Sequence, residues 1–325
     1  MKRKIFLGLV VLIAMAFSVF AQQYDQVYVA GTIGEGQNQR ATLWMNGVSQ
    51  ALSNFYSEAN SVFISDNDLY VSGWVERQDT VATLWKNSVS QVFSNTMYWI
   101  ESIYVSGSDV YVAGSALEIG SRSPRATLWK NGIPQTLSNT WSQAFSVYVS
   151  GSDVYVAGWA EGQDTVATLW KNGVPQTLSN TLSCARSVYV SDNDVYVAGY
   201  AGNDSSLATL WKNGAPQALS NTSSKAYSMF LSGSDVYVVG SVGLIQNERA
   251  TLWRNGVPQT LSNTESWAGS VYVSGSNVYV AGTVGQGQSS IILGQKQSAR
   301  ATLWKNGTPQ TLSDTVSWAN SVFVR

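Results

Sequence analysis

The tetrapeptide Ala-Thr-Leu-Trp occurs seven times in this chain of 325 residues, and each copy lies inside a longer repeated unit. Successive copies follow one another at intervals of 41, 44, 41, 41, 42 and 51 residues. A period in the forties that contains four strand-like segments is typical of a propeller blade. The repeat therefore predicts an all-β chain with seven blades. The copies end at Trp44, Trp85, Trp129, Trp170, Trp211, Trp253 and Trp304.

One unit, residues 187–219, shows four short β-runs, which we name strands A to D in chain order. Their sequences are SVYVS, VYVAG, ATLW and PQAL, rich in residues that favour strands. Asn213-Gly214 separates the third run from the fourth and is a strong hairpin signal. Pro216 fits an outermost strand, because proline has no N–H to donate to a ladder. We expect a four-stranded antiparallel meander.

The first and last expected strands of the chain can belong to one blade. The first expected strand, residues 27–31, is a B strand, and the last, residues 321–325, is an A strand. If the C-terminal A strand pairs beside the N-terminal B, C and D strands, every blade is complete and the ring is closed. An open solenoid is the alternative, but solenoids carry atypical polar caps and none is visible here. We predict one seven-bladed β-propeller domain over residues 22–325.

These units, which read VYVAG…ATLWKNG, resemble kelch-like seven-bladed β-propellers and, more closely, secreted bacterial repeat proteins built from the same motifs. The resemblance covers residues 24–325. Kelch units carry Gly-Gly after the second strand, whereas five of the seven positions here carry Ala-Gly, as at Ala113-Gly114 and Ala157-Gly158. The Gly-His…Trp-Asp signature of WD40 repeats is absent from the sequence. The resemblance implies an architecture and no active site.

The first 21 residues have the pattern of a secretory signal peptide. Lys2, Arg3 and Lys4 precede an apolar run over residues 5–17, and Ala21 ends the segment. The run is short for a membrane span, which needs roughly 20 residues. We expect a cleaved, exported protein that is periplasmic, cell-surface or extracellular, with no membrane span in the mature chain.

Net charge limits the classes of partner that we expect, and cysteine content limits the disulfides. Without its first 21 residues the chain keeps 16 basic against 20 acidic residues, a formal net charge of −4. This balance gives no basic footprint, so we expect no nucleic-acid partner. The one cysteine, Cys184, cannot form an internal disulfide, and we interpret it as a small loop residue.

The chain contains no histidine. This removes the commonest general base and metal ligand and any Ser-His-Asp arrangement. We therefore expect no metal, no cofactor, no catalytic residue and no enzymatic activity. The Asp-Asn-Asp turns at residues 66–68 and 192–194 could hold calcium, but other units have Ser-Gly-Ser-Asp there, which is a hairpin turn. Carboxylate pairs serve glycosidases without histidine, and the candidates are Glu35, Glu58, Glu101, Glu118, Glu161, Asp164, Asp204 and Glu265.

The seven copies form an internal comparison. We expect the constant Trp to pack between blades and the Lys after it to be a solvated hairpin residue. Variation gathers between strands D and A, in the frame Asn-Thr-x-Ser-x-Ala-x-Ser. In a meander, the D-to-A and B-to-C connections lie on one face, so one face is variable. The second x is Glu58, Trp99, Gln143, Cys184, Lys225, Trp267 and Trp318, and the third is Asn60, Glu101, Phe145, Arg186, Tyr227, Gly269 and Asn320.

Variable, aromatic-rich loops on a rigid frame are the usual layout of a binding surface. We therefore favour an exported, non-catalytic propeller that recognises a protein or glycan partner through this face. The alternatives are a glycoside-acting enzyme that uses loop carboxylates and a purely structural cell-surface repeat protein whose loops diverged after duplication. The predicted contacts are Tyr56, Trp74, Trp99, Trp141, Phe145, Trp159, Tyr200, Tyr227, Trp267 and Trp318.

Overall fold

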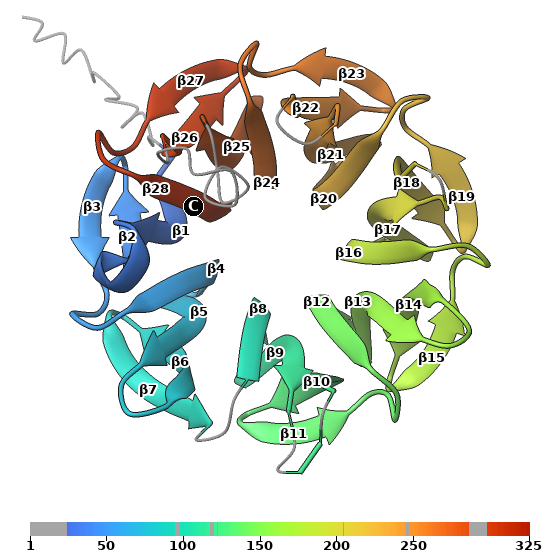
Figure 1. The fold of residues 1–325 in the computed structure, drawn as a ribbon, viewed down its shortest axis with the longest axis horizontal. Coiled ribbons are helices and arrows are strands. Elements are labelled where there is room, and N and C mark those ends of the chain that lie inside the picture. The colour runs from blue at the N-terminus through green and yellow to red at the C-terminus, as the bar shows by residue number, and fades with distance from the viewer. Residues whose placement is uncertain are drawn as a thin grey trace, which may run out of the picture.

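The computed structural model describes residues 25–94, 98–117, 120–121, 123–203, 205–244, 247–285 and 298–325. The expected signal peptide over residues 1–21 lies outside these ranges, as does most of the long insertion in the last B-to-C loop. The described residues form seven four-stranded antiparallel sheets arranged as a ring (Figure 1). No helix in these ranges is long and apolar enough to cross a membrane.

Each sheet is one blade, and its four strands run outward from the axis of the ring in the order A to D. The A strands are β4 (Ser57–Ser65), β8 (Tyr98–Ser106), β12 (Ser142–Ser150), β16 (Ser183–Ser191), β20 (Ser224–Ser232), β24 (Ser266–Ser274) and β28 (Ser317–Val324). The B strands are β1 (Val27–Ile33), β5 (Asp68–Glu76), β9 (Asp109–Ala116), β13 (Asp153–Glu161), β17 (Asp194–Ala201), β21 (Asp235–Val242) and β25 (Asn277–Val284).

The C strands carry the ATLW motif, and the D strands form the outer rim. The C strands are β2 (Arg40–Met45), β6 (Thr80–Lys86), β10 (Arg125–Lys130), β14 (Thr165–Lys171), β18 (Leu207–Lys212), β22 (Arg249–Arg254) and β26 (Arg300–Lys305). The D strands are β3 (Val48–Ala51), β7 (Val89–Ser94), β11 (Ile133–Thr136), β15 (Val174–Thr177), β19 (Ala215–Ala218), β23 (Val257–Thr260) and β27 (Thr308–Thr311). One 3₁₀ turn, η1 (Gly36–Asn38), lies in the first B-to-C loop.

The ring is closed by the C-terminal strand. Strand β28 pairs antiparallel with β1, so that blade 1 has the order β28-β1-β2-β3 (Figure 1). Gln26 and Arg325 extend this pairing with two backbone hydrogen bonds of 2.9 and 3.0 Å. Asp25 adds a link to blade 7, because its carboxylate accepts hydrogen bonds from Ser274, Asn277 and Tyr279. The predicted seven-bladed fold and its one-plus-three closure are confirmed.

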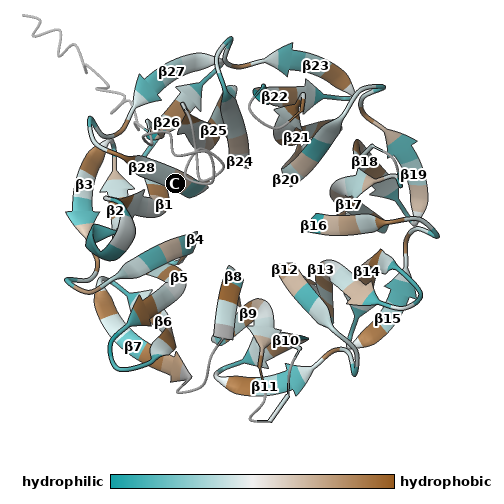
Figure 2. Cartoon of the chain, in the orientation of Figure 1, coloured by the Kyte–Doolittle hydropathy of each residue, from teal (hydrophilic) through white to brown (hydrophobic). Residues whose placement is uncertain are grey.

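The hydrophobic core is divided among the seven interfaces between neighbouring blades. Each interface has its own cluster of buried residues, and Figure 2 shows apolar residues in every blade. The ATLW tryptophans are at most 1% exposed, and each packs against a neighbouring blade, as Trp170 does against Leu128 of blade 3. This confirms the predicted role of the constant Trp.

Two further rings join the A strands around the axis. In the first, a serine Oγ of each A strand accepts a hydrogen bond from a backbone N–H of the next one, as Ser146 does from Val188 at 3.2 Å. The other serines are Ser61, Ser102, Ser187, Ser228, Ser270 and Ser321. In the second, two residues further along each strand, seven aromatic rings form a closed collar with centroids 4.6 to 5.5 Å apart. The collar consists of Phe63, Tyr104, Tyr148, Tyr189, Phe230, Tyr272 and Phe323.

The A-to-B and C-to-D turns form one face of the ring, which we call the constant face. There the Lys that follows ATLW is a solvent-exposed hairpin residue, as predicted, and it also forms an ion pair in several blades: Lys171 lies 2.7 Å from Asp153 and over the ring of Tyr155. Asn172 donates to the same carboxylate. Asp68 and Asp194, from the suspected calcium turns, make the same contacts with Lys and Asn, and the described residues contain no group of acidic, His or Cys side chains that could hold a metal.

Every A strand has a β-bulge at the same position, immediately before its serine. The bulge carries the A-strand backbone against the constant glycine of VYVAG in strand B. A Cβ on Gly158 would collide with the backbone carbonyl of Gln143, and the other six glycines face the equivalent carbonyl. Glycine is therefore required here by close approach of two backbones.

We predict that Gly158→Ala destabilises the protein by about 2 to 4 kcal/mol, because either the bulge or the β12–β13 pairing must shift. Gly162→Ala is the matched control: a Cβ there meets only the Asp164 carbonyl at 3.8 Å, an ordinary contact. Urea denaturation of both variants measures the difference. Equal stabilities would show that the bulge does not require glycine.

Candidate functional site

The variable positions lie in a different place from the one predicted. The A strands begin four residues earlier than the SVYVS run suggested, so the second and third variable positions belong to strands and not to the D-to-A loops. The third position is the extra residue of each bulge. A bulge leaves one residue without a partner in the ladder and turns its side chain aside. Seven bulges thus place seven variable residues, six of them with side chains, around one axis.

These bulge residues, which we call the channel ring, surround the mouth of a central cavity of about 280 Å³. The cavity opens on the variable face, the face of the D-to-A and B-to-C connections. The aromatic collar lies three residues further along each A strand, about 10 Å deeper. The channel ring consists of Asn60, Glu101, Phe145, Arg186, Tyr227, Gly269 and Asn320.

The channel ring is chemically uneven, and its basic side lies on blades 4 to 6. The Arg186 guanidinium lies 3.8 Å from the centroid of Phe145 and 5.7 Å from that of Tyr227, so one cation sits between two predicted contact residues. Between blades 5 and 6, the Lys225 ammonium lies 5.5 Å from the centroid of the Tyr200 ring. The rings of three predicted contact residues are therefore occupied by cations of the protein itself.

The acidic side lies on blades 2 and 3. Glu101 accepts a hydrogen bond of 3.1 Å from Gln143, and Glu58 accepts one of 3.1 Å from Asn320. Burial raises the pKa of Glu101 to about 7, an effect that the charge of Glu58 reinforces and that of Arg186 opposes. Burial also raises the pKa of Glu58. Glu101 is therefore a group that changes its charge near neutral pH.

The pKa of Glu101 makes stability depend on pH in a defined direction. The folded protein binds the proton more tightly than the unfolded chain, so stability falls as the pH rises from about 4.5 to about 7. We predict that Glu101→Gln is more stable than the wild type at pH 8, by about 1 to 3 kcal/mol, and equally stable at pH 4. Denaturation at both pH values tests this, and a difference that does not change with pH would contradict it.

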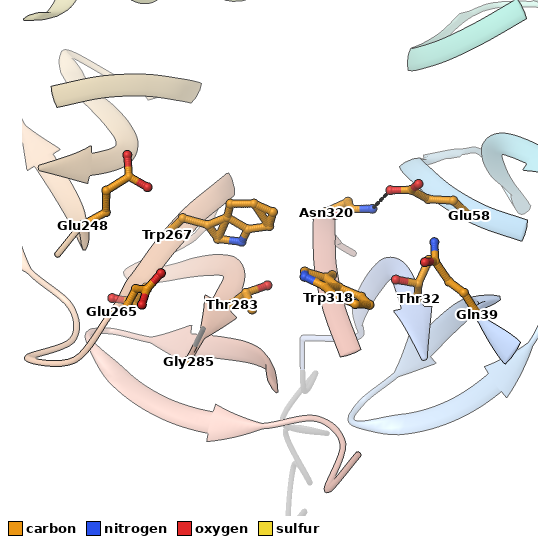
Figure 3. A pocket seen from close by; sticks show the side chains of 11 residues that line it. Thr32, Gln39, Glu58, Glu248, Glu265, Trp267, Thr283, Gly285, Trp318 and Asn320 are labelled. Carbon is orange, nitrogen blue, oxygen red and sulfur yellow. Dashed lines mark hydrogen bonds between the residues drawn. The ribbon is translucent and has the colours of Figure 1, made fainter. Parts of the chain in front are cut away.

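A second and larger pocket, of about 480 Å³, lies between blades 7 and 1 at the edge of the channel mouth (Figure 3). The indoles of Trp267 and Trp318 approach its centre from opposite sides (Figure 3). Three carboxyl groups surround them, and the described residues that line the pocket include no Lys or Arg. The carboxyl groups belong to Glu58, Glu248 and Glu265.

The remaining predicted contacts lie on the variable face around blades 2 to 4. Tyr56 and Trp74 meet edge to face with centroids 4.9 Å apart, and Trp141 and Trp159 do the same at 5.2 Å. Trp99, on strand β8 between these pairs, is 41% exposed. The structure thus separates the predicted contact residues into three groups. The first lies on the variable face around blades 2 to 4, the second packs against Arg186 and Lys225, and the third is the pair of indoles in the pocket.

Several groups of the site were not among the predicted contacts. Arg186 and Asn320 occupy the same repeat position as Phe145 and Tyr227, and that shared position was a signal for them. Glu248 ends a B-to-C loop, one residue before the strand that carries ATLW. Buried Thr283 follows the VYVAG glycine of blade 7, the repeat position that carries Trp74, Trp159 and Tyr200 in other blades, and that shared position was a signal for it.

The candidate carboxylates differ in how far they are buried. Glu58, Glu101 and Glu265 are half-buried at the channel mouth or the pocket, whereas Glu35, Glu161 and Asp164 are exposed. Glu118 and Asp204 lie outside the described residues. Cys184 belongs to strand β16 rather than to a loop, and burial raises the pKa of its thiol.

No protein-family model matches this chain, and no curated protein matches it in sequence. Solved structures share its fold. An acylaminoacyl peptidase from Pyrococcus horikoshii superposes with a TM-score of 0.53 at 11% identity over 90% of this chain, which spans 52% of the peptidase. The β-propeller domain of the Trilobed protease from Pyrococcus furiosus, described as having an open velcro topology, gives 0.51 at 12% identity over 89% of this chain and 94% of that one. Identities this low show a shared fold alone.

These neighbours overturn one expectation. We inferred from the missing histidine and catalytic motifs that the chain is not an enzyme. Structures that share the fold of this chain include an acylaminoacyl peptidase and the β-propeller domain of a protease, so the fold does not separate this chain from proteins that take part in catalysis. The inference failed because a repeat scaffold carries no information about the chemistry with which it is associated.

Proposed function

We propose that this protein is a binding propeller that recognises a protein or glycan partner through its variable face, at the mouth of the central channel. We also propose that it is exported and that it is related to the kelch-like secreted repeat proteins that its VYVAG and ATLWKNG units resemble. One observation carries the binding function: seven equivalent bulges surround a single opening with six different residue types, of which only asparagine occurs twice.

The contrast between the two faces supports this proposal. On the constant face, the Asp-Lys-Asn-Tyr contacts recur from blade to blade. On the variable face, the same repeat places Glu101, Phe145, Arg186 and Tyr227 in neighbouring copies of one position. An uneven ring makes one composite site rather than seven equal ones. A rigid frame with one polarised opening is suited to a single partner in one orientation.

We predict that Phe145→Asn, Arg186→Asn and Tyr227→Asn, combined, abolish partner binding without unfolding the protein. Asparagine already occupies this bulge as Asn60 and Asn320, so the scaffold accepts it. The control is Ile133→Thr, a change on the outer rim to the residue that blade 7 carries as Thr308. Glycan arrays and affinity capture compare the two variants with the wild type.

The expected result is a set of partners shared by the wild type and the rim control and lost by the triple variant. A folded triple variant that keeps every partner would place binding elsewhere. If the wild type captures neither protein nor glycan, the structural role of a cell-surface repeat protein is favoured instead.

A second candidate function, glycoside hydrolysis, is favoured by the paired carboxyl groups of Glu58 and Glu101 in one cavity. A carboxyl whose pKa is raised to about 7 keeps its proton at neutral pH and can act as a general acid. Should the wild type hydrolyse any aryl glycoside, we predict that Glu101→Gln lowers kcat at least about 100-fold. The exposed Glu161→Gln is the control, and equal loss in both variants would contradict the assignment.

A further inference from the structure

The pocket between blades 7 and 1 has a chemistry of its own (Figure 3). We propose that it takes the cationic side chain of a lysine or arginine residue carried by an extended peptide segment of a partner protein. This inference rests on the proposed binding function and names the partner chemistry that this part of the channel mouth selects.

Charge is the first argument. Glu58 reaches the pocket from strand β4, Glu248 from the loop before β22, and Glu265 from the loop before β24, so three separate blades supply carboxyl groups. Among the residues that the structure describes, no basic side chain lines the pocket to balance them. The nearby Arg249 donates instead to the Glu248 backbone carbonyl and to the side chain of Asn247. A ligand cation would supply the missing positive charge.

Two polar groups without partners are the second argument. Thr283 is buried, with 3% of its surface exposed, and its Oγ1 has no hydrogen-bond partner in the part of the chain that the structure describes. The indole N–H of Trp267 also lacks an acceptor. Both residues line the pocket, and buried polar groups are normally satisfied. Thr283 Oγ1 can accept from an ammonium or guanidinium N–H, and the Trp267 N–H can donate to a peptide carbonyl.

The two indoles are the third argument. Trp267 from β24 and Trp318 from β28 both line the pocket (Figure 3). Indole faces attract cations and also pack along the methylene stem of Lys or Arg. A neutral sugar would stack on the same rings, but it would leave the carboxylates without a counter-charge. A small quaternary amine such as choline would satisfy the carboxylates, yet it has no N–H for Thr283 and no peptide carbonyl for Trp267.

The test is calorimetric titration of the purified protein with acetyl-Ala-Lys-Ala-amide, its Arg analogue and its norleucine analogue, which keeps the stem and removes the charge. Choline and methyl glucoside are the competing probes. We expect the Lys and Arg peptides to bind at least about tenfold more tightly than the norleucine peptide, and less tightly at high salt. Glu265→Gln and Thr283→Val should each weaken binding about tenfold, because each removes one contact with a charged group. Glu161→Gln, which removes an exposed charge on blade 4, should leave it unchanged.

Thr283→Val replaces an unpartnered hydroxyl by a methyl group of similar volume, so thermal unfolding should show a folded variant. Equal affinity for the norleucine peptide would overturn the inference, and so would binding of choline or the glucoside in place of the peptides. Peptide binding that neither Glu265→Gln nor Thr283→Val weakens would also overturn it. If the peptides do not bind but the variant with three Asn substitutions loses a partner of the wild type, only this inference is contradicted. If the peptides do not bind and that variant keeps every partner, the proposed function is contradicted as well.

Discussion

The β-bulge in the innermost strand of every blade is the constraint on which the channel of this propeller depends. It brings the backbone of strand A onto the glycine of strand B, and it turns one extra side chain toward the axis. The neighbouring serine then bonds to the next blade, and the aromatic collar follows two residues later. One local irregularity, repeated seven times, thus fixes the glycine, the serine ring and the place of the channel-ring residues.

The difference between the constant face and the variable face follows from this geometry. Residues that join blades to one another, or that fix the tight turns, recur because every interface needs the same contacts. The bulge residue has no partner in the ladder, so the fold leaves its identity open. Asn60 and Asn320 still use that freedom structurally, since each donates to a carbonyl of the next A strand. Glu101, Phe145, Arg186 and Tyr227 depart from this role and give the channel its uneven charge.

The pocket between blades 7 and 1 lies at the interface where the two ends of the domain meet. Trp318 and Asn320 come from β28. Thr32, on β1, and Gln39, in the loop before β2, belong to blade 1, which β28 completes. Closure of the ring and formation of the pocket are therefore one event. The unpartnered Thr283 and Trp267 groups lie at this interface. The other buried side-chain groups without a partner, among the residues that the structure describes, are the Ser72 hydroxyl and the indoles of Trp170, Trp211 and Trp253.

The sequence by itself determined the blades, their number and the closure, because a strand pattern and a tight Asn-Gly turn are local properties that seven copies repeat. It also determined which positions vary. It could not show that Arg186 would lie between Phe145 and Tyr227, or that Glu58 would share a cavity with Glu101, since these residues are about forty positions apart in the chain. Only the tertiary structure decided that the variable positions meet at one opening, because the bulge that turns them inward arises from the packing of strand A on strand B and leaves no sign in the repeat except its glycine.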